Sequence, residues 1–202
     1  MEQDAMTYDV IIIGAGPAGL AAAIHLKQRN AELTVCILEK GAQVGSHLLS
    51  GAVLNPVSLK ALLPNRWKKA SLNTPVTEDS FYYLNAKKAY QLPTPPQMHN
   101  KHNFVISLGE LGRFLATEAE ALGCEIYPGF AATALLWGEH GEVKGVSTGE
   151  MGIDKSGEKT ANYQPGMKLY AKQTLFAEGC RGELSEQLIK HFKLRDEAHP
   201  QT

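Results

Sequence analysis

The stretch YDVIIIGAGPAG, residues 8–19, decides the fold of this chain. After Asp9 its first half is apolar and β-branched, which is typical of a strand covered on both faces of a parallel sheet. A helical pattern follows from Ala18 to about Gln28, and Leu33 to Glu39 is predicted to be a second buried strand. This βαβ unit places the two strands side by side and parallel. The sequence therefore predicts an α/β fold of the Rossmann-like type.

Residues 14–19, GAGPAG, match the pattern G-x-G-x-x-G, in which each glycine has a physical role. Gly14 permits the tight turn after the strand, Gly16 leaves room for a diphosphate, and Gly19 lets the helix pack closely on the sheet. The N–H groups and positive dipole end at the helix start bind phosphates without a lysine. Glu39, 20 residues beyond Gly19, can accept hydrogen bonds from ribose hydroxyls and disfavours the 2′-phosphate of NADP. The pattern predicts a dinucleotide site rather than a purely structural turn.

The glycine pattern does not separate FAD from NAD, because both dinucleotides contain the ADP half. Residues 40–51 add glycines and small polar groups that suit a longer flavin tail, although an ordinary loop has the same composition. Residues 174–182, TLFAEGCRG, are predicted to form a strand that returns to the nucleotide site, the alternative being a strand that ends in a glycine turn.

The rest of the chain is expected to complete the sheet. Prolines interrupt residues 41–103, where we expect short helices and loops, with one helix over 54–63. Residues 152–166 are expected to be rich in turns. The other expected elements are a helix over 108–122, strands over 125–127, 131–137, 143–148 and 169–177 with a hairpin between the second and third, and a last helix over 183–193.

Composition limits the classes of partner. Twenty Lys and Arg against 21 Asp and Glu give a net charge of −1, so no overall field recruits nucleic acid or an anionic membrane, and partners must be argued from local sites. The cysteines at 36, 124 and 180 are expected to be free thiols, and their spacing excludes an iron–sulfur cluster held by this chain alone. His99 and His102 have no carboxylate or thiol beside them and are expected to be surface residues rather than metal ligands.

Three kinds of motif that are not found in the sequence bear on its expected location and chemistry. No apolar run is long enough to span a bilayer, so any membrane contact is expected to be peripheral. The first residues resemble neither a secretory signal nor a transit peptide, which favours the bacterial cytoplasm. No nucleophile or acid–base residue is predicted, because redox chemistry belongs to the cofactor.

Seven ordered blocks resemble the N-terminal, FAD-binding part of electron-transfer flavoprotein:ubiquinone oxidoreductases of the bacterial type. They are YDVIIIGAGPAGLAAAIHLKQ, VCILEKGAQVGSHLLSGAVLNP, LNTPVTED, LPTPPQMHN, EALGCEIYPGF, VKGVSTGEMGI and LFAEGCRGELSEQLI. The related geranylgeranyl reductases and aromatic hydroxylases lack LNTPVTED and PTPPQMHN. The resemblance implies an enzyme that takes electrons from reduced electron-transfer flavoprotein into FAD. It passes them through a 4Fe–4S cluster and reduces ubiquinone, as a peripheral protein of the bacterial inner membrane.

The resemblance also implies site residues. Those expected at the ADP portion of FAD are Gly14, Gly16, Pro17, Ala18, Gly19 and Glu39. Those expected at the ribityl or flavin portion are Lys40, Gly45, His47, Leu49, Ser50 and Gly51. Those expected in the wall of the nucleotide pocket are Ala132, Ala177, Glu178 and Gly179. Those expected to face the quinone or the membrane are Leu92, Pro93, Pro96, Met98 and Phe104.

Residues 1–202 are thus expected to be one FAD-binding domain that is incomplete relative to the family. Its nucleotide-binding core covers about 1–60 and 108–202, and about 61–107 form an insert that resembles the start of the quinone-facing or membrane-facing region. The chain holds no ligands for the cluster and is expected to be a fragment. Two alternatives stay open: a related FAD-dependent reductase or hydroxylase that consumes NAD(P)H, or a non-catalytic gene remnant.

Overall fold

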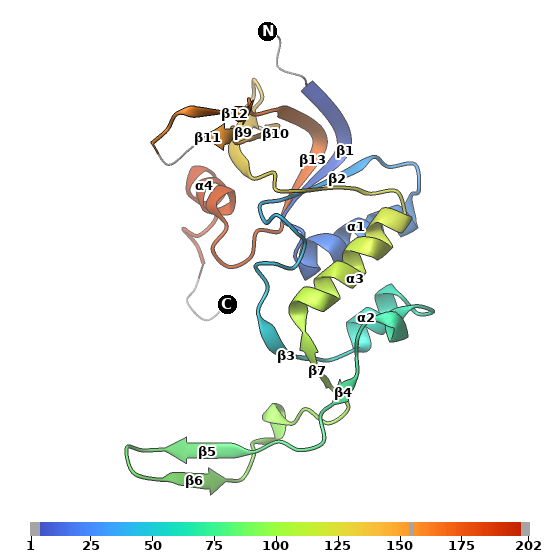
Figure 1. Cartoon of the computed structure of the whole chain (residues 1–202), viewed down its shortest axis with the longest axis vertical. Coiled ribbons are helices and arrows are strands. Elements are labelled where there is room, and N and C mark those ends of the chain that lie inside the picture. The colour runs from blue at the N-terminus through green and yellow to red at the C-terminus, as the bar shows by residue number, and fades with distance from the viewer. Residues whose placement is uncertain (1–4, 154–155, 199–202) are drawn as a thin grey trace.

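A central sheet organises the chain, and the computed structural model describes residues 5–153 and 156–198 (Figure 1). The sheet has the order β8-β2-β1-β13-β10-β9. Neighbours among its first four strands run parallel, and those strands are β8 (Glu125–Pro128), β2 (Val35–Glu39), β1 (Ala5–Ile13) and β13 (Lys168–Phe176). β10 (Val143–Thr148) is antiparallel to β13 and to β9 (Ala132–Trp137). The predicted Rossmann-like fold with a hairpin is confirmed.

Both faces of β1 are buried, which explains its unbroken apolar run. Val10 and Ile12 belong to one core, whereas Ile11 and Ile13 belong to the other. β2 alternates in the same way, with Ile37 in the first core. Successive side chains of a strand point to opposite faces, so a strand between two cores has no polar face.

Three helices cover one face of the sheet, and a last helix packs on the other face. The first core joins the sheet to α1 (Pro17–Arg29), α2 (Val57–Leu62) and α3 (Leu108–Ala121). The second contains Leu135, Val146 and Leu184, the last from α4 (Glu183–His191). None of the helices in the described ranges is long and apolar enough to cross a bilayer.

Residues 41–103, where short helices and loops were expected, also contain strands, and another strand follows them directly. β3 (Ser50–Leu54) and β4 (Thr74–Pro75) both pair with β7 (Phe104–Ser107). The expected helix over 54–63 starts later, at Val57, because Leu54 ends β3. These strands are short and their partners are distant in sequence, so local periodicity did not reveal them.

A separate hairpin extends from this region, away from the central sheet (Figure 1). It consists of β5 (Phe81–Leu84) and β6 (Ala89–Leu92), and the short helix η2 (Pro96–Met98) follows it. A second unpredicted strand pair, β11 (Met151–Ile153) and β12 (Lys159–Gln164), lies in the segment expected to be turns.

One partly buried ion pair connects the irregular region to α3. Glu118 is almost fully buried on α3, and its carboxylate lies 2.6 Å from the guanidinium of Arg66. Arg66 directly precedes the short helix η1 (Trp67–Lys69). The pair therefore fixes the segment after α2 against the helical layer.

Candidate functional site

The glycine loop connects β1 to α1 and lies against the end of β13. Gly14 has φ +105°, and a Cβ built there would lie 2.5 Å from the carbonyl oxygen of Ala177. A Cβ on Gly19 would lie 2.1 Å from the carbonyl oxygen of Gly14. The Ala177 N–H donates to the Ile13 carbonyl over 2.8 Å. Only glycine fits at positions 14 and 19, and the strand predicted to return to the nucleotide site does return to this loop.

Gly16 differs from its two neighbours in the pattern. Its φ of −75° and ψ of 174° suit any residue, and no atom lies within 4 Å of the place where its Cβ would be. Gly16 is the N-cap of α1, and no side chain caps the helix. The first turn has no acidic residue, and Pro17 has no backbone N–H that would need a hydrogen-bond partner. The helix start therefore presents free N–H groups beside open space, which is the arrangement that binds phosphate.

Glu39 closes one side of this loop. Its Oε2 accepts the Ala15 N–H at 3.0 Å, and its Oε1 accepts the Gly41 N–H at 2.7 Å. The side chain keeps 13% of its surface exposed, and Nδ1 of His47 lies 3.9 Å from Oε1. Each carboxylate oxygen has a second acceptor site, so Glu39 holds the loop in shape and can still accept hydroxyl donors.

The segment that connects β8 to β9 contacts the chain just after Glu39. The Gly129 N–H donates to the Gly41 carbonyl over 2.8 Å, and β9 begins at Ala132, three residues later. Ala132 is half-buried against the second core. The residues predicted at the ADP portion therefore gather around one loop, and the contact of these residues and of Ala132 with a nucleotide stays a prediction.

The residues predicted at the flavin portion lie in the segment between β2 and β3. Lys40, His47, Leu49, Ser50 and Gly51 are exposed. Gly45 has a different requirement: at φ +89° its Cβ would lie 2.5 Å from the carbonyl oxygen of Gly109 at the start of α3. Sequence reasoning missed this backbone contact, because nothing in the sequence pairs position 45 with position 109.

Glu178 has a structural partner that the sequence did not reveal. Its carboxylate accepts hydrogen bonds from the backbone N–H groups of Leu184 and Ser185 at 3.3 and 2.7 Å, and from the Ser185 hydroxyl at 2.6 Å. Glu178 thus caps the first turn of α4, which has no N-cap side chain of its own. Ala177 adjoins the glycine loop and Gly179 is exposed at φ +85°, so this segment faces the site with its backbone.

The residues predicted to face quinone or membrane separate into two places. Leu92, Pro93, Pro96 and Met98 are exposed on the projecting hairpin and on the segment that follows it, which includes η2. Phe104 lies apart from them, half-buried in β7 against the first core.

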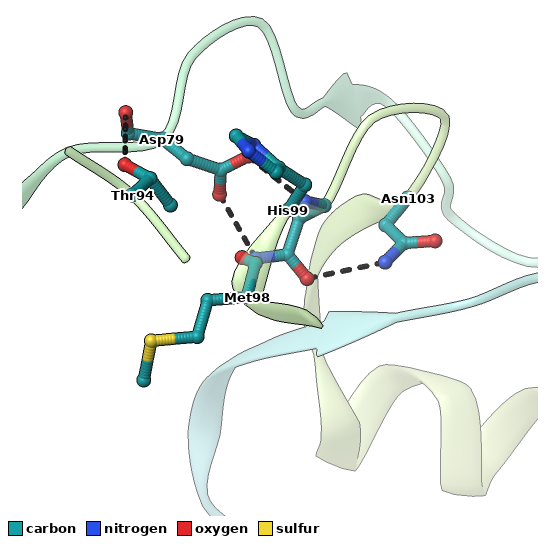
Figure 2. A network of polar contacts seen from close by, with 6 residues as sticks. Asp79, Thr94, Met98, His99 and Asn103 are labelled. Atoms are coloured by element: carbon teal, nitrogen blue, oxygen red, sulfur yellow. Dashed lines mark hydrogen bonds and ion pairs between the residues drawn. The ribbon is translucent and has the colours of Figure 1, made fainter. Parts of the chain in front are cut away.

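A polar network fixes the base of the hairpin, as Figure 2 shows. Both oxygens of Asp79 accept hydrogen bonds from Asn100, from its backbone N–H at 2.8 Å and from its side-chain amide at 2.9 Å. The Thr94 hydroxyl donates to the Asp79 carbonyl at 3.4 Å. These bonds join the segment before β5 to the segment after β6, and the two from Asn100 lower the pKa of Asp79.

Other cavities and clusters lie elsewhere. A pocket of about 470 Å³ lies beside the C-terminal half of β13, residues 140–143 line its other side, and no residue of the glycine loop lines it. Within residues 5–153 and 156–198, no group of three or more His, Cys, Asp or Glu side chains is placed to hold a metal. The glycine loop with Glu39 is therefore the candidate site.

Comparison with known proteins agrees with this geometry. Residues 9–67 match the family model described as an FAD binding domain. An electron transfer flavoprotein-ubiquinone oxidoreductase of Pseudomonas aeruginosa is 53% identical over all of this chain, and the chain covers 38% of that protein. The mitochondrial protein of the same name from Dictyostelium discoideum is 49% identical over 99% of the chain, which covers 34% of it. The chain is homologous to the electron transfer flavoprotein-ubiquinone oxidoreductases.

The chain thus spans about a third of the length of these oxidoreductases. Solved structures with the same fold include a geranylgeranyl bacteriochlorophyll reductase-like protein from Thermoplasma acidophilum, with a TM-score of 0.61 at 20% identity over 86% of this chain and 40% of that one. Another is the anhydrotetracycline hydroxylase OxyS from Streptomyces rimosus, with a TM-score of 0.59 at 19% identity over 91% of this chain and 34% of that one. At such low identity these structures show the fold alone.

Proposed function

We propose that the chain binds FAD and forms the flavin-binding part of an electron transfer flavoprotein-ubiquinone oxidoreductase. The observation that carries the proposal is the open space at Gly16, next to an uncapped helix start and to Glu39, within the segment that matches an FAD binding domain. The names of relatives about 50% identical to the chain support the choice of reaction.

The residues of the site fit the ADP half of the cofactor. The N–H groups at the start of α1 bind the diphosphate, and the helix dipole adds to this attraction. Glu39 accepts from the ribose hydroxyls, while its bonds to Ala15 and Gly41 keep the loop in the shape that receives the phosphates. The segments that hold Lys40, Gly51 and Ala177 flank the rest of the ligand. When bound, FAD supplies the redox chemistry, and this chain supplies binding and orientation.

Electrons in this proposal come from reduced electron-transfer flavoprotein and leave for ubiquinone. A 4Fe–4S cluster takes part only if the protein includes sequence beyond these 202 residues, because their three cysteines are isolated from one another.

The projecting hairpin is proposed to contact the membrane surface where the quinone lies. Tyr83 and Leu84 expose 60% and 69% of their surface, and Leu92 and Met98 are exposed nearby. Aromatic and aliphatic groups gathered on one exposed element mark an interaction site, and tyrosine is favoured at the membrane interface. Serine substitutions at Tyr83 and Leu84 should weaken binding to lipid vesicles whatever the charge of the lipid.

A chimera tests the reaction. This chain replaces the matching region of the Pseudomonas aeruginosa relative, and the purified chimera is assayed for quinone reduction by reduced electron-transfer flavoprotein. The proposal expects a flavin-loaded enzyme with this activity, and the unaltered relative is the control. A chimera that carries flavin, ignores electron-transfer flavoprotein and oxidises NAD(P)H would favour the reductase or hydroxylase alternative. A soluble chimera that takes up no flavin would contradict FAD binding by this chain.

A further inference from the structure

The tip of the projecting hairpin carries a local charge that the net charge of the whole chain conceals. Its turn, Asn85-Ala86-Lys87-Lys88, joins β5 to β6. Between Phe81 and Met98 the sequence has no Asp, Glu or Arg, so the two lysines are its only charges. The hairpin region is therefore +2 within a chain of net charge −1.

The turn holds these lysines at the end of the hairpin. The side-chain oxygen of Asn85 accepts the backbone N–H groups of Lys87 and Lys88 at 2.9 and 2.8 Å, and the Asn85 N–H donates to the Lys88 carbonyl at 3.0 Å. All residues of the turn are exposed. The lysine side chains take no part in these bonds, so the turn should keep its shape when Lys87 and Lys88 are changed.

Neither ammonium group is neutralised within the described part of the chain. No carboxylate there lies within 4 Å of Lys87 or Lys88, although other lysines, such as Lys144 and Lys172, do have such partners. The nearest acidic residue before the hairpin in the sequence is Asp79. Its carboxylate already accepts two hydrogen bonds from Asn100. Within the described residues, the tip is thus a pair of cations without a carboxylate partner, at the end of a hairpin that exposes apolar side chains.

We propose that Lys87 and Lys88 bind the anionic headgroups of phospholipids, so that the hairpin selects negatively charged bilayers. This inference rests on the proposed membrane contact and adds a lipid class to it. Tyr83 and Leu84 on one strand and Tyr90 on the other are exposed in the half of the hairpin nearer the lysines, and Tyr82 and Leu92 are exposed farther along it. At the surface of a lipid bilayer, the aromatic and aliphatic side chains of such an element contact the acyl chains, and its lysines contact the phosphates of the headgroups. The hairpin has no acidic residue that would oppose this contact.

The experiment compares vesicles of neutral phosphatidylcholine with vesicles that also contain anionic phosphatidylglycerol. The chain, the variant K87Q/K88Q and the control variant K68Q/K69Q are titrated with each, and partition is measured by sedimentation. The control changes the same charge at an adjacent exposed lysine pair on η1. Circular dichroism checks that all three proteins are folded.

K87Q/K88Q should bind the anionic vesicles about 30-fold more weakly than the unaltered chain, since each lysine near such a surface contributes about fivefold. K68Q/K69Q should match the unaltered chain, and high salt should remove the difference. Equal binding of K87Q/K88Q and the unaltered chain to anionic vesicles would overturn the proposal, and the proposed membrane contact would stand. If the unaltered chain binds neither kind of vesicle, the membrane contact itself is wrong.

Discussion

Alanine at Gly16 separates the ligand role of the glycine loop from its structural role. The backbone at Gly16 is already in a conformation that alanine adopts, and the new methyl group meets no protein atom within 4 Å. Alanine is a poorer N-cap than glycine, but it also restricts the unfolded chain, and these effects oppose each other. The free energy of unfolding should change by less than about 1 kcal/mol.

The same methyl group occupies the space proposed for the diphosphate. Loss of one hydrogen bond from a backbone N–H to a charged phosphate oxygen costs about 1.5 to 3 kcal/mol. G16A should therefore bind FAD at least about tenfold and up to about a hundredfold more weakly, as measured by quenching of flavin fluorescence.

G19A is the matched comparison, because its methyl group would lie 2.1 Å from the Gly14 carbonyl oxygen. This overpacking should lower the free energy of unfolding by about 1 to 3 kcal/mol or more, which a thermal melt detects. If G16A binds FAD as tightly as the unaltered chain, or if it unfolds as readily as G19A, the assignment of the space at Gly16 to phosphate is refuted.

Three further outcomes follow from buried or hydrogen-bonded groups. Burial raises the pKa of Cys36 to about 12, so a thiol reagent at neutral pH should label the exposed Cys180 in the folded chain, and three labels in place of one under these conditions would contradict the described core. The pKa of Asp79 is lowered in the fold, so its contribution to stability is present above the unfolded pKa of about 3.9 and lost as pH falls through the folded pKa. Hydrogen exchange at the hairpin base should show this loss in the unaltered chain and not in D79N, and identical pH profiles would disprove the network. R66A should destabilise the fold by about 1 to 3 kcal/mol, less than a fully buried pair because the arginine is partly exposed, and R66M/E118M should recover much of the loss in urea unfolding.

The part of the fold that sequence predicts well is the part specified by local pattern. β1, α1 and β2 follow from two periodicities and a glycine turn within a few dozen consecutive residues, and Glu39 follows from its distance to Gly19. The pairing of β3 with β7 was not predictable in this way, because about fifty residues separate two short strands that prolines surround. The hydrogen-bond partner of Glu178 also depends on tertiary structure. The sequence showed only that Glu178 lies near glycines at the end of a strand. In the structure, that carboxylate accepts hydrogen bonds from the first turn of α4.

FAD binding by the purified chain tests the central claim most directly. After incubation with FAD and removal of free ligand by gel filtration, the chain should retain flavin absorbance at one FAD per chain. ADP should compete with FAD, because the glycine loop and Glu39 hold the ADP half, and NADP should compete poorly because Glu39 repels its 2′-phosphate. A folded, monodisperse chain that retains no flavin and is not stabilised by ADP would contradict the account.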